Sequence, residues 1–125
     1  MAGGQQYWPG SVFRNPGNMG HMWVVVGILE EDRLLTNWSS KRPGSDTTCL
    51  LVPGDHPCIT HDSVIKYEFI KEIPLVTLLQ LIEEGNLQPN VDINDEALQR
   101  IQEGIFTSRK VPPYIKSRYA HLRKK

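Results

Sequence analysis

The sequence has few cysteines, no long apolar run and no net charge, and each absence excludes a class of protein. Cys49 and Cys58 are its two cysteines, too few for the disulfide framework of a small secreted domain. No apolar stretch approaches the roughly 20 residues that a transmembrane helix needs. Residues 1–6 lack the basic region and the apolar stretch of a signal peptide. We therefore expect a reduced, cytoplasmic protein without a membrane partner.

The overall composition indicates one small globular domain. Of the 125 residues, 39% are hydrophobic and 22% are charged, as in soluble proteins with a modest core. A chain of this length buries about two-thirds of its unfolded surface and needs no disulfides for stability. The 14 basic side chains balance the 14 acidic ones, so net charge alone points to neither nucleic acid nor membrane. We predict a single domain over residues 1–125.

Short apolar and β-branched runs, separated by turns, fill the first part of the chain, from about residue 8 to residue 71. Such runs predict strands, and the polar turn at 30–32 predicts a hairpin between two of them. Proline and glycine mark loops at 41–46 and 53–57. The expected strands cover residues 11–14, 22–29, 33–38, 48–52 and 63–70.

The segment 72–108 is predicted to be helical. A first helix is expected to open at Ile73–Pro74, with proline in its first turn, and to stop at Gly85, because its apolar residues follow the spacing of one helix face. A second helix is expected after Asn94 as N-cap and before Gly104. Strands followed by helices predict the α+β fold class, mainly β: a small β-barrel with C-terminal helices.

Charge is segregated towards the end of the chain. Residues 72–103 hold seven acidic side chains and one basic one, whereas residues 104–125 hold seven basic and no acidic ones. The basic tail, 109–125, also carries two tyrosines, a composition that can contact phosphates and stack on bases. Alternatively, the tail is a terminal helix whose charges pair with the acidic segment. The side chains that would dock in that case are Tyr114, Ile115 and Leu122.

Histidines are the side chains best suited to acid–base chemistry near neutral pH. His21 stands at the entrance of the first core strand, and His56 and His61 share the loop before the last strand. One interpretation of this loop is a zinc site, because the ligand types suit that metal, although its spacing is not that of a known zinc motif. The alternative is that hydrogen bonds to backbone amides hold a tight loop. The residues concerned in the zinc interpretation are Cys49, Asp55, His56, Cys58 and His61.

Two tryptophans and one cysteine in the predicted strands are also open to interpretation. Trp23 and Trp38 can stack a nucleobase, but a small barrel also needs large side chains for its packing. Cys49 is expected to be a buried apolar residue of a strand, without the charged neighbours that activate a thiol.

One set of motifs goes beyond general patterning, and it ends in a proline- and histidine-containing stretch. It consists of Phe13, Gly20–Val26, Leu34–Ser40, Thr48-Cys49 and Pro53-Gly54-Asp55-His56-Pro57-x-Ile59-x-His61-x-Ser63-Val64-x-x-Tyr67. Together these segments resemble the divergent PemK/MazF-like toxins, over roughly residues 8–110. The resemblance implies an SH3-like β-barrel with added helices, usually dimeric. It also implies a ribosome-independent endoribonuclease of a toxin–antitoxin system, with single-stranded RNA as substrate and an antitoxin as possible partner.

The resemblance also implies a cleavage centre. In the family, an arginine at the start of the second strand and a Thr or Ser at the end of the next strand form it. His21 falls at the arginine position and Ser39 at the Thr/Ser position. Histidine retains acid–base chemistry but removes a fixed cation from the phosphorane, so Arg14, Lys41 or Arg42 is expected to supply positive charge.

The chemistry that such a site performs is definite. A base takes the proton of a ribose 2′-OH, the oxygen attacks the adjacent phosphate, and an acid protonates the leaving 5′-oxygen. We predict that His21 and His56 are this pair, with Ser39 on a phosphate oxygen. Arg14, Lys41, Arg42 and His61 are the predicted RNA-binding residues. No metal or cofactor is required. The alternative is a non-catalytic SH3-like barrel that binds nucleic acid or a protein partner.

Overall fold

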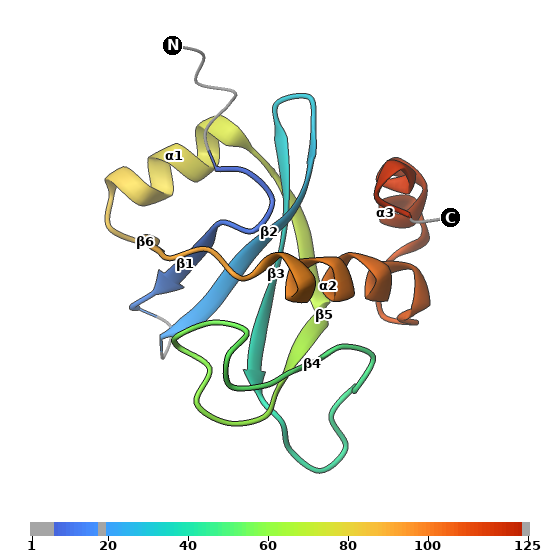
Figure 1. Cartoon of the computed structure of the whole chain (residues 1–125). Coiled ribbons are helices and arrows are strands. Elements are labelled where there is room, and N and C mark those ends of the chain that lie inside the picture. The colour runs from blue at the N-terminus through green and yellow to red at the C-terminus, as the bar shows by residue number, and fades with distance from the viewer. Residues whose placement is uncertain (1–6, 18–19, 124–125) are drawn as a thin grey trace.

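Six antiparallel strands form a single curled sheet, a half-barrel, in the computed structural model (Figure 1). The structure describes residues 7–17 and 20–123. The sheet order is β4-β5-β3-β2-β1-β6. The strands are β1 (Val12–Asn15), β2 (His21–Leu29), β3 (Asp32–Ser40), β4 (Leu50–Leu51), β5 (Ser63–Pro74) and β6 (Gln88–Asn90).

Helices cover both faces of this sheet. In Figure 1, α1 (Leu75–Glu83) lies to the left of the sheet, α2 (Asp95–Thr107) starts over β3 and β5 and extends to the right, and α3 (Pro113–Arg118) lies to the right. A short 3-10 turn, Ala120–Leu122, follows α3. The predicted α+β class, mainly β with C-terminal helices, is therefore confirmed. No helix within the described residues is long and apolar enough to cross a membrane.

The two faces have separate apolar cores, which explains the unbroken apolar run of β2. Val24 and Val26 belong to the larger core, which the sheet forms with α2 and α3. Val25 points to the other face and packs with α1 through Leu75 and Leu78. Because successive strand residues face opposite sides, a strand that is covered on both sides shows no polar alternation.

The predicted β-hairpin is confirmed, and the strands differ from prediction mainly at the sheet edges. The segment expected as a strand at 48–52 pairs only over Leu50–Leu51, and β5 continues to Pro74, three residues into the predicted helical segment. Pro74 consequently precedes α1 as its N-cap and is not in its first turn. Strand β6 was not predicted. It contains Pro89 and pairs only with β1, as expected for proline at an edge.

Helix α2 begins after its expected N-cap and α1 stops before its expected glycine, but α2 ends later than expected. The Asn94 side chain caps α2 by accepting a hydrogen bond of 2.7 Å from the Ala97 amide. Gly85 has a φ of +80° just after α1, the conformation typical of a helix stop. The predicted stop at Gly104 is wrong, because α2 continues to Thr107. A Cβ at Gly104 would overlap the Tyr67 hydroxyl, so this glycine makes room for close packing.

The basic tail packs against the sheet over most of its described length. Ile115 and Tyr119 are fully buried, and Leu122 packs partly buried against the same core. Arg118 forms ion pairs of 3.0 Å with Asp32 and 2.6 Å with Glu72. The docked-helix alternative therefore describes this part of the tail. Its expectation for Tyr114 is wrong, since 64% of that side chain is exposed. Lys124 and Lys125 lie outside the described residues.

Candidate functional site

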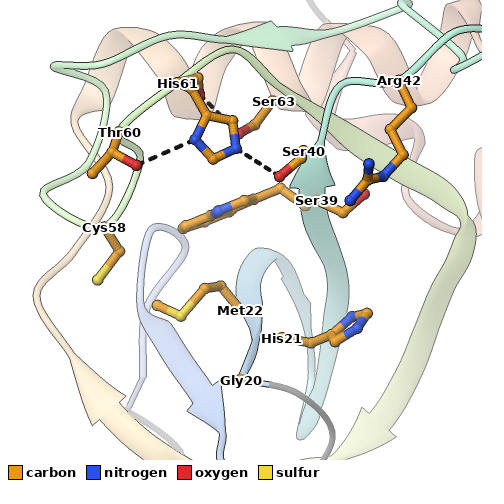
Figure 2. Close-up of a pocket in the computed structure, with 11 residues that line it drawn as sticks. Gly20, His21, Met22, Ser39, Ser40, Arg42, Cys58, Thr60, His61 and Ser63 are labelled. Carbon is orange, nitrogen blue, oxygen red and sulfur yellow. Dashed lines mark hydrogen bonds between the residues drawn. The ribbon is translucent and has the colours of Figure 1, made fainter.

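An open hollow of about 290 Å³ lies where β2 begins and β3 ends (Figure 2). We call it the site hollow. It combines two imidazoles, a guanidinium and several hydroxyl groups, a set of side chains suited to an anionic ligand. The residues that line it are Gly20, His21, Met22, Trp38, Ser39, Ser40, Arg42, Cys58, Thr60, His61 and Ser63.

Antiparallel pairing brings the residues of the site hollow together. Met22 pairs with Trp38 across β2 and β3, which puts the preceding His21 near the following Ser39. Across β3 and β5, Ser40 pairs with Ser63, and this register carries the loop before β5 to the same end of the sheet. The predicted convergence of His21 with Ser39 is therefore present.

His61 is held by side chains on both of its ring nitrogens. Its Nε2 lies 2.6 Å from the Ser40 hydroxyl, and its Nδ1 lies 3.2 Å from the Thr60 hydroxyl. The ring itself is exposed in the site hollow. If the ring proton is on Nδ1, it is donated to Thr60, and Nε2 accepts the hydroxyl hydrogen of Ser40. This tautomer makes Nε2 a base that already faces a hydroxyl group.

The structure does not bring His56 to the site hollow. Its side chain is 2% exposed, its Nε2 donates to the Val91 carbonyl at 2.7 Å, and its Nδ1 accepts from the Cys58 amide at 3.0 Å. The ring also packs at a tilt against Trp38, with 5.3 Å between the ring centroids. With both nitrogens engaged by backbone groups, His56 is placed to hold the loop, and His61 is the second histidine beside His21 that lines the site hollow.

Asp55 holds the same loop. Its carboxylate accepts the Val52 amide at 2.9 Å and forms a 2.9 Å ion pair with Arg100 of α2. Arg100 also donates to the Leu50 carbonyl at 2.6 Å. The interpretation in which Asp55 and the histidines hold a tight loop through hydrogen bonds to backbone amides is therefore confirmed for Asp55 and His56. It is wrong for His61, whose ring contacts two hydroxyl side chains instead.

The residues of the zinc interpretation do not form one cluster, although Cys58 and His61 both line the site hollow. Asp55 is paired with Arg100, His56 is bonded to Val91, and Cys49 lies buried in the core. Burial raises the pKa of the Cys49 thiol to about 11. In the part of the chain that the structure describes, no group of three or more His, Cys, Asp or Glu side chains could hold a metal ion.

The three predicted cations lie at different distances from the site. Arg42 lines the site hollow, and in Figure 2 its side chain extends towards Ser39. The Arg14 guanidinium lies against Gly20, since a Cβ built at Gly20 would come within 3.1 Å of it. Lys41 is exposed and lines the neighbouring hollow instead. Arg42 is therefore the cation placed to contact a ligand of the site hollow.

The tryptophans serve mainly in packing. Trp38 is 5% exposed, belongs to the larger core and forms one wall of the site hollow. Trp23 is half-buried on the opposite face, where the Lys71 ammonium lies 4.7 Å from the centre of its ring.

Three hydroxyl side chains of the site were missed by the sequence analysis: Ser40, Thr60 and Ser63. The pairing of β3 with β5 is what brings them to the site, because it places the residues just before Ser63 beside the end of β3.

Comparisons with models of protein families, with curated proteins and with solved structures each found no match for this chain.

Proposed function

We propose that the site hollow is the active site of an endoribonuclease that cleaves single-stranded RNA by attack of a ribose 2′-OH on the adjacent phosphate. The observation that carries this proposal is that His21, His61, Arg42 and Ser39 line one hollow. Two imidazoles supply the base and the acid of such a reaction, and a guanidinium stabilises the charge on phosphorus.

His61 acts as the base in this proposal. Its Nε2 accepts from a hydroxyl when the ring proton is on Nδ1, and a ribose 2′-OH replaces Ser40 at that nitrogen. The 2′-oxygen then forms a bond to phosphorus while the bond from phosphorus to the 5′-oxygen breaks. His21, in its protonated form, delivers a proton to that oxygen. The products are a 2′,3′-cyclic phosphate and a 5′-hydroxyl.

Arg42 and Ser39 stabilise the phosphorane in the same proposal. Both donate hydrogen bonds to anionic oxygens, and Arg42 compensates for the cation that histidine replaces at position 21. No step requires a metal ion, so we expect cleavage in the presence of EDTA. Each acid–base partner is expected to contribute about 10²–10⁴-fold to the rate.

We further propose that the protein is a divergent PemK/MazF-like toxin with an SH3-like barrel, acting as a homodimer and inhibited by an antitoxin. This proposal rests on the motifs of the sequence and is supported by the curled antiparallel sheet with C-terminal helices. The first position of β2, where the family has its arginine, here holds His21 in the site hollow.

The test is incubation of purified protein with a mixed-sequence single-stranded RNA in EDTA. We expect discrete fragments that end in 2′,3′-cyclic phosphates, and at least a 100-fold loss of rate for His21→Ala and for His61→Ala. His121→Ala is the matched control, because this exposed histidine packs beside Tyr119 and away from the hollow. If folded His21→Ala and His61→Ala proteins cleave like the parent, or the parent does not cleave, the non-catalytic barrel remains.

A further inference from the structure

A row of three adjoining hollows leads from the candidate site to the end of α2. The site hollow shares Arg42 with a second hollow over the loop after β3, which we call the loop hollow. The loop hollow in turn shares Gly44 with a third, the α2-end hollow. Hollows that share a lining residue are neighbours, so the three lie in a row, which we call the path. The loop hollow is lined by Lys41, Arg42, Pro43, Gly44, Ser45 and Thr47, and the α2-end hollow by Gly44, Asp46, Thr48, Thr107, Arg109 and Lys110.

Cations follow this path along its whole length. Lys41, Arg42, Arg109 and Lys110 all have exposed side chains and line the hollows. They come from segments about 70 residues apart in the sequence, the loop after β3 and the end of α2. Their convergence makes a positive track that the balanced charge of the chain conceals, and such a track attracts a polyanion.

One acidic side chain, Asp46, lies among the residues lining these hollows, and it is engaged. It accepts the Thr48 amide at 2.9 Å and the Thr48 hydroxyl at 2.6 Å, and it also accepts the Ser108 hydroxyl at 3.4 Å. Burial raises the pKa of Asp46, but these hydrogen bonds outweigh burial and hold it below its ordinary value. The contact with Ser108 therefore ties the loop after β3 to the end of α2 through a carboxylate.

The loop and the α2 end are also ordered by their own backbone contacts. The Arg42 amide donates to the Ser45 hydroxyl at 2.9 Å, and the Ser45 amide donates to the Arg42 carbonyl at 3.0 Å. The Lys110 amide donates to the Ser108 hydroxyl at 3.1 Å. The cations of the track are thus presented from a backbone that is ordered before a ligand arrives, which lowers the entropic cost of binding.

We propose that this track binds the phosphodiester backbone of the single-stranded RNA that flanks the cleaved linkage. The inference rests on the proposed function for the identity of the ligand, and it adds Arg109 and Lys110 as substrate-binding residues. The RNA runs from the site hollow past Arg42 and the loop after β3 to the end of α2. Contacts of this kind position a nucleic acid without reading its sequence.

The test measures binding separately from cleavage. A fluorescein-labelled single-stranded RNA of mixed sequence is titrated with the His21→Ala protein over a range of salt concentrations, and binding is followed by anisotropy. A single-stranded ligand loses about 0.7 in the slope of log affinity against log salt for each phosphate contact removed. We expect Arg109→Gln/Lys110→Gln, in the same background, to bind more weakly and to lower the slope by about 1.4.

The matched control is Lys116→Gln/Arg123→Gln, which removes the same charge from the terminal segment but outside the track. It is expected to retain the affinity and the slope. Equal losses in both double variants, an unchanged slope in Arg109→Gln/Lys110→Gln, or no RNA binding by the His21→Ala protein would overturn the proposal. A parent protein that binds RNA through the track but does not cleave it would reject the ribonuclease alone.

Discussion

The Nε2 atom of His61 lies 2.6 Å from the Oγ atom of Ser40, at the open end of the sheet where β3 finishes. The Ser40 hydroxyl is thus hydrogen-bonded to Nε2 of His61, the nitrogen that acts as the base in the proposed reaction. Thr60 contacts the other nitrogen at 3.2 Å, so the orientation and the tautomer of the ring depend on two neighbours. In the proposed reaction, Ser40 is exchanged for substrate and Thr60 remains.

Thr60→Val tests this positioning role. The change keeps the shape of the side chain and removes the hydroxyl that is hydrogen-bonded to Nδ1 of His61. We expect the cleavage rate to fall about tenfold, which corresponds to about 1.4 kcal/mol of transition-state stabilisation. Thr60→Ser, which retains the hydroxyl, is the control and should act like the parent; an equal loss there contradicts the role.

Asp55→Ala tests the support beneath the site. Asp55 has a side chain that is 7% exposed and joins its loop to Arg100 of α2. Its removal leaves the Val52 amide without its partner and deprives Arg100 of its 2.9 Å ion pair, and we expect a loss of about 2–3 kcal/mol in the free energy of unfolding by urea. Glu96→Ala is the control. That carboxylate is 82% exposed and 3.9 Å from Arg100, so its loss should cost under about 0.5 kcal/mol.

The sequence predicted correctly that His21 and Ser39 lie together, but it did not predict which loop histidine lies near them. The hairpin of β2 and β3 follows from local patterning, and its antiparallel register alone sets His21 beside Ser39. The choice between His56 and His61 could not be made in this way, since both stand in one loop. Long-range contacts decide it: Val91 accepts the Nε2 proton of His56, while the β3–β5 register brings His61 to the hollow.

Gly104 shows the same limit for the fold. A glycine after an apolar helical pattern predicts a helix stop, because local propensity is the only information that the pattern contains. In the structure α2 passes through Gly104, where Tyr67 donates a 2.7 Å hydrogen bond to the Ile101 carbonyl. The tyrosine comes from β5, more than 30 residues earlier in the chain, so local propensity does not reveal it.

Gly104→Ala therefore has an effect whose sign distinguishes the two roles. At a spacious helical position, alanine stabilises by about 0.5–1 kcal/mol. Here the new methyl group meets the Tyr67 hydroxyl, and we expect a destabilisation of about 1–3 kcal/mol in thermal or urea unfolding. Introducing Gly104→Ala into a Tyr67→Phe background, which lacks that hydroxyl, should cost less. Additive effects in this double-mutant cycle would count against direct contact.

The cysteines should differ sharply in reactivity. Cys58 is exposed and lines the site hollow, whereas Cys49 is 3% exposed and burial raises its pKa to about 11. We expect a disulfide reagent to modify one thiol in the native protein, with Cys58→Ser abolishing that reaction. Single-stranded RNA bound in the site hollow should slow it at least several-fold. Equal reactivity of both thiols, or no protection by RNA, would disagree with this arrangement.

The tail contact should make stability depend on pH. Glu72 accepts the Tyr119 hydroxyl at 2.5 Å and pairs with Arg118 at 2.6 Å. Burial raises the pKa of Glu72, but the Tyr119 hydrogen bond and Arg118 outweigh it and lower the pKa below its ordinary value of 4.5. A carboxylate with a lowered folded-state pKa stabilises the protein fully above its unfolded-state pKa. That contribution disappears as the pH falls through the folded-state value.

Glu72→Gln tests this contribution through its pH dependence. At pH 7 the variant should lose about 1 kcal/mol of unfolding free energy, because a neutral amide replaces the charged acceptor of Tyr119. As the pH falls below 4.5 and through the lowered folded-state pKa of Glu72, the parent carboxylate becomes protonated, so the difference between parent and variant should shrink towards zero. Glu83→Gln, on the exposed side of α1, should show no such trend. A difference for Glu72→Gln that stays constant from pH 7 to pH 3 would mean that its charge does not hold the tail, and that Ile115 and Tyr119 dock by apolar burial alone.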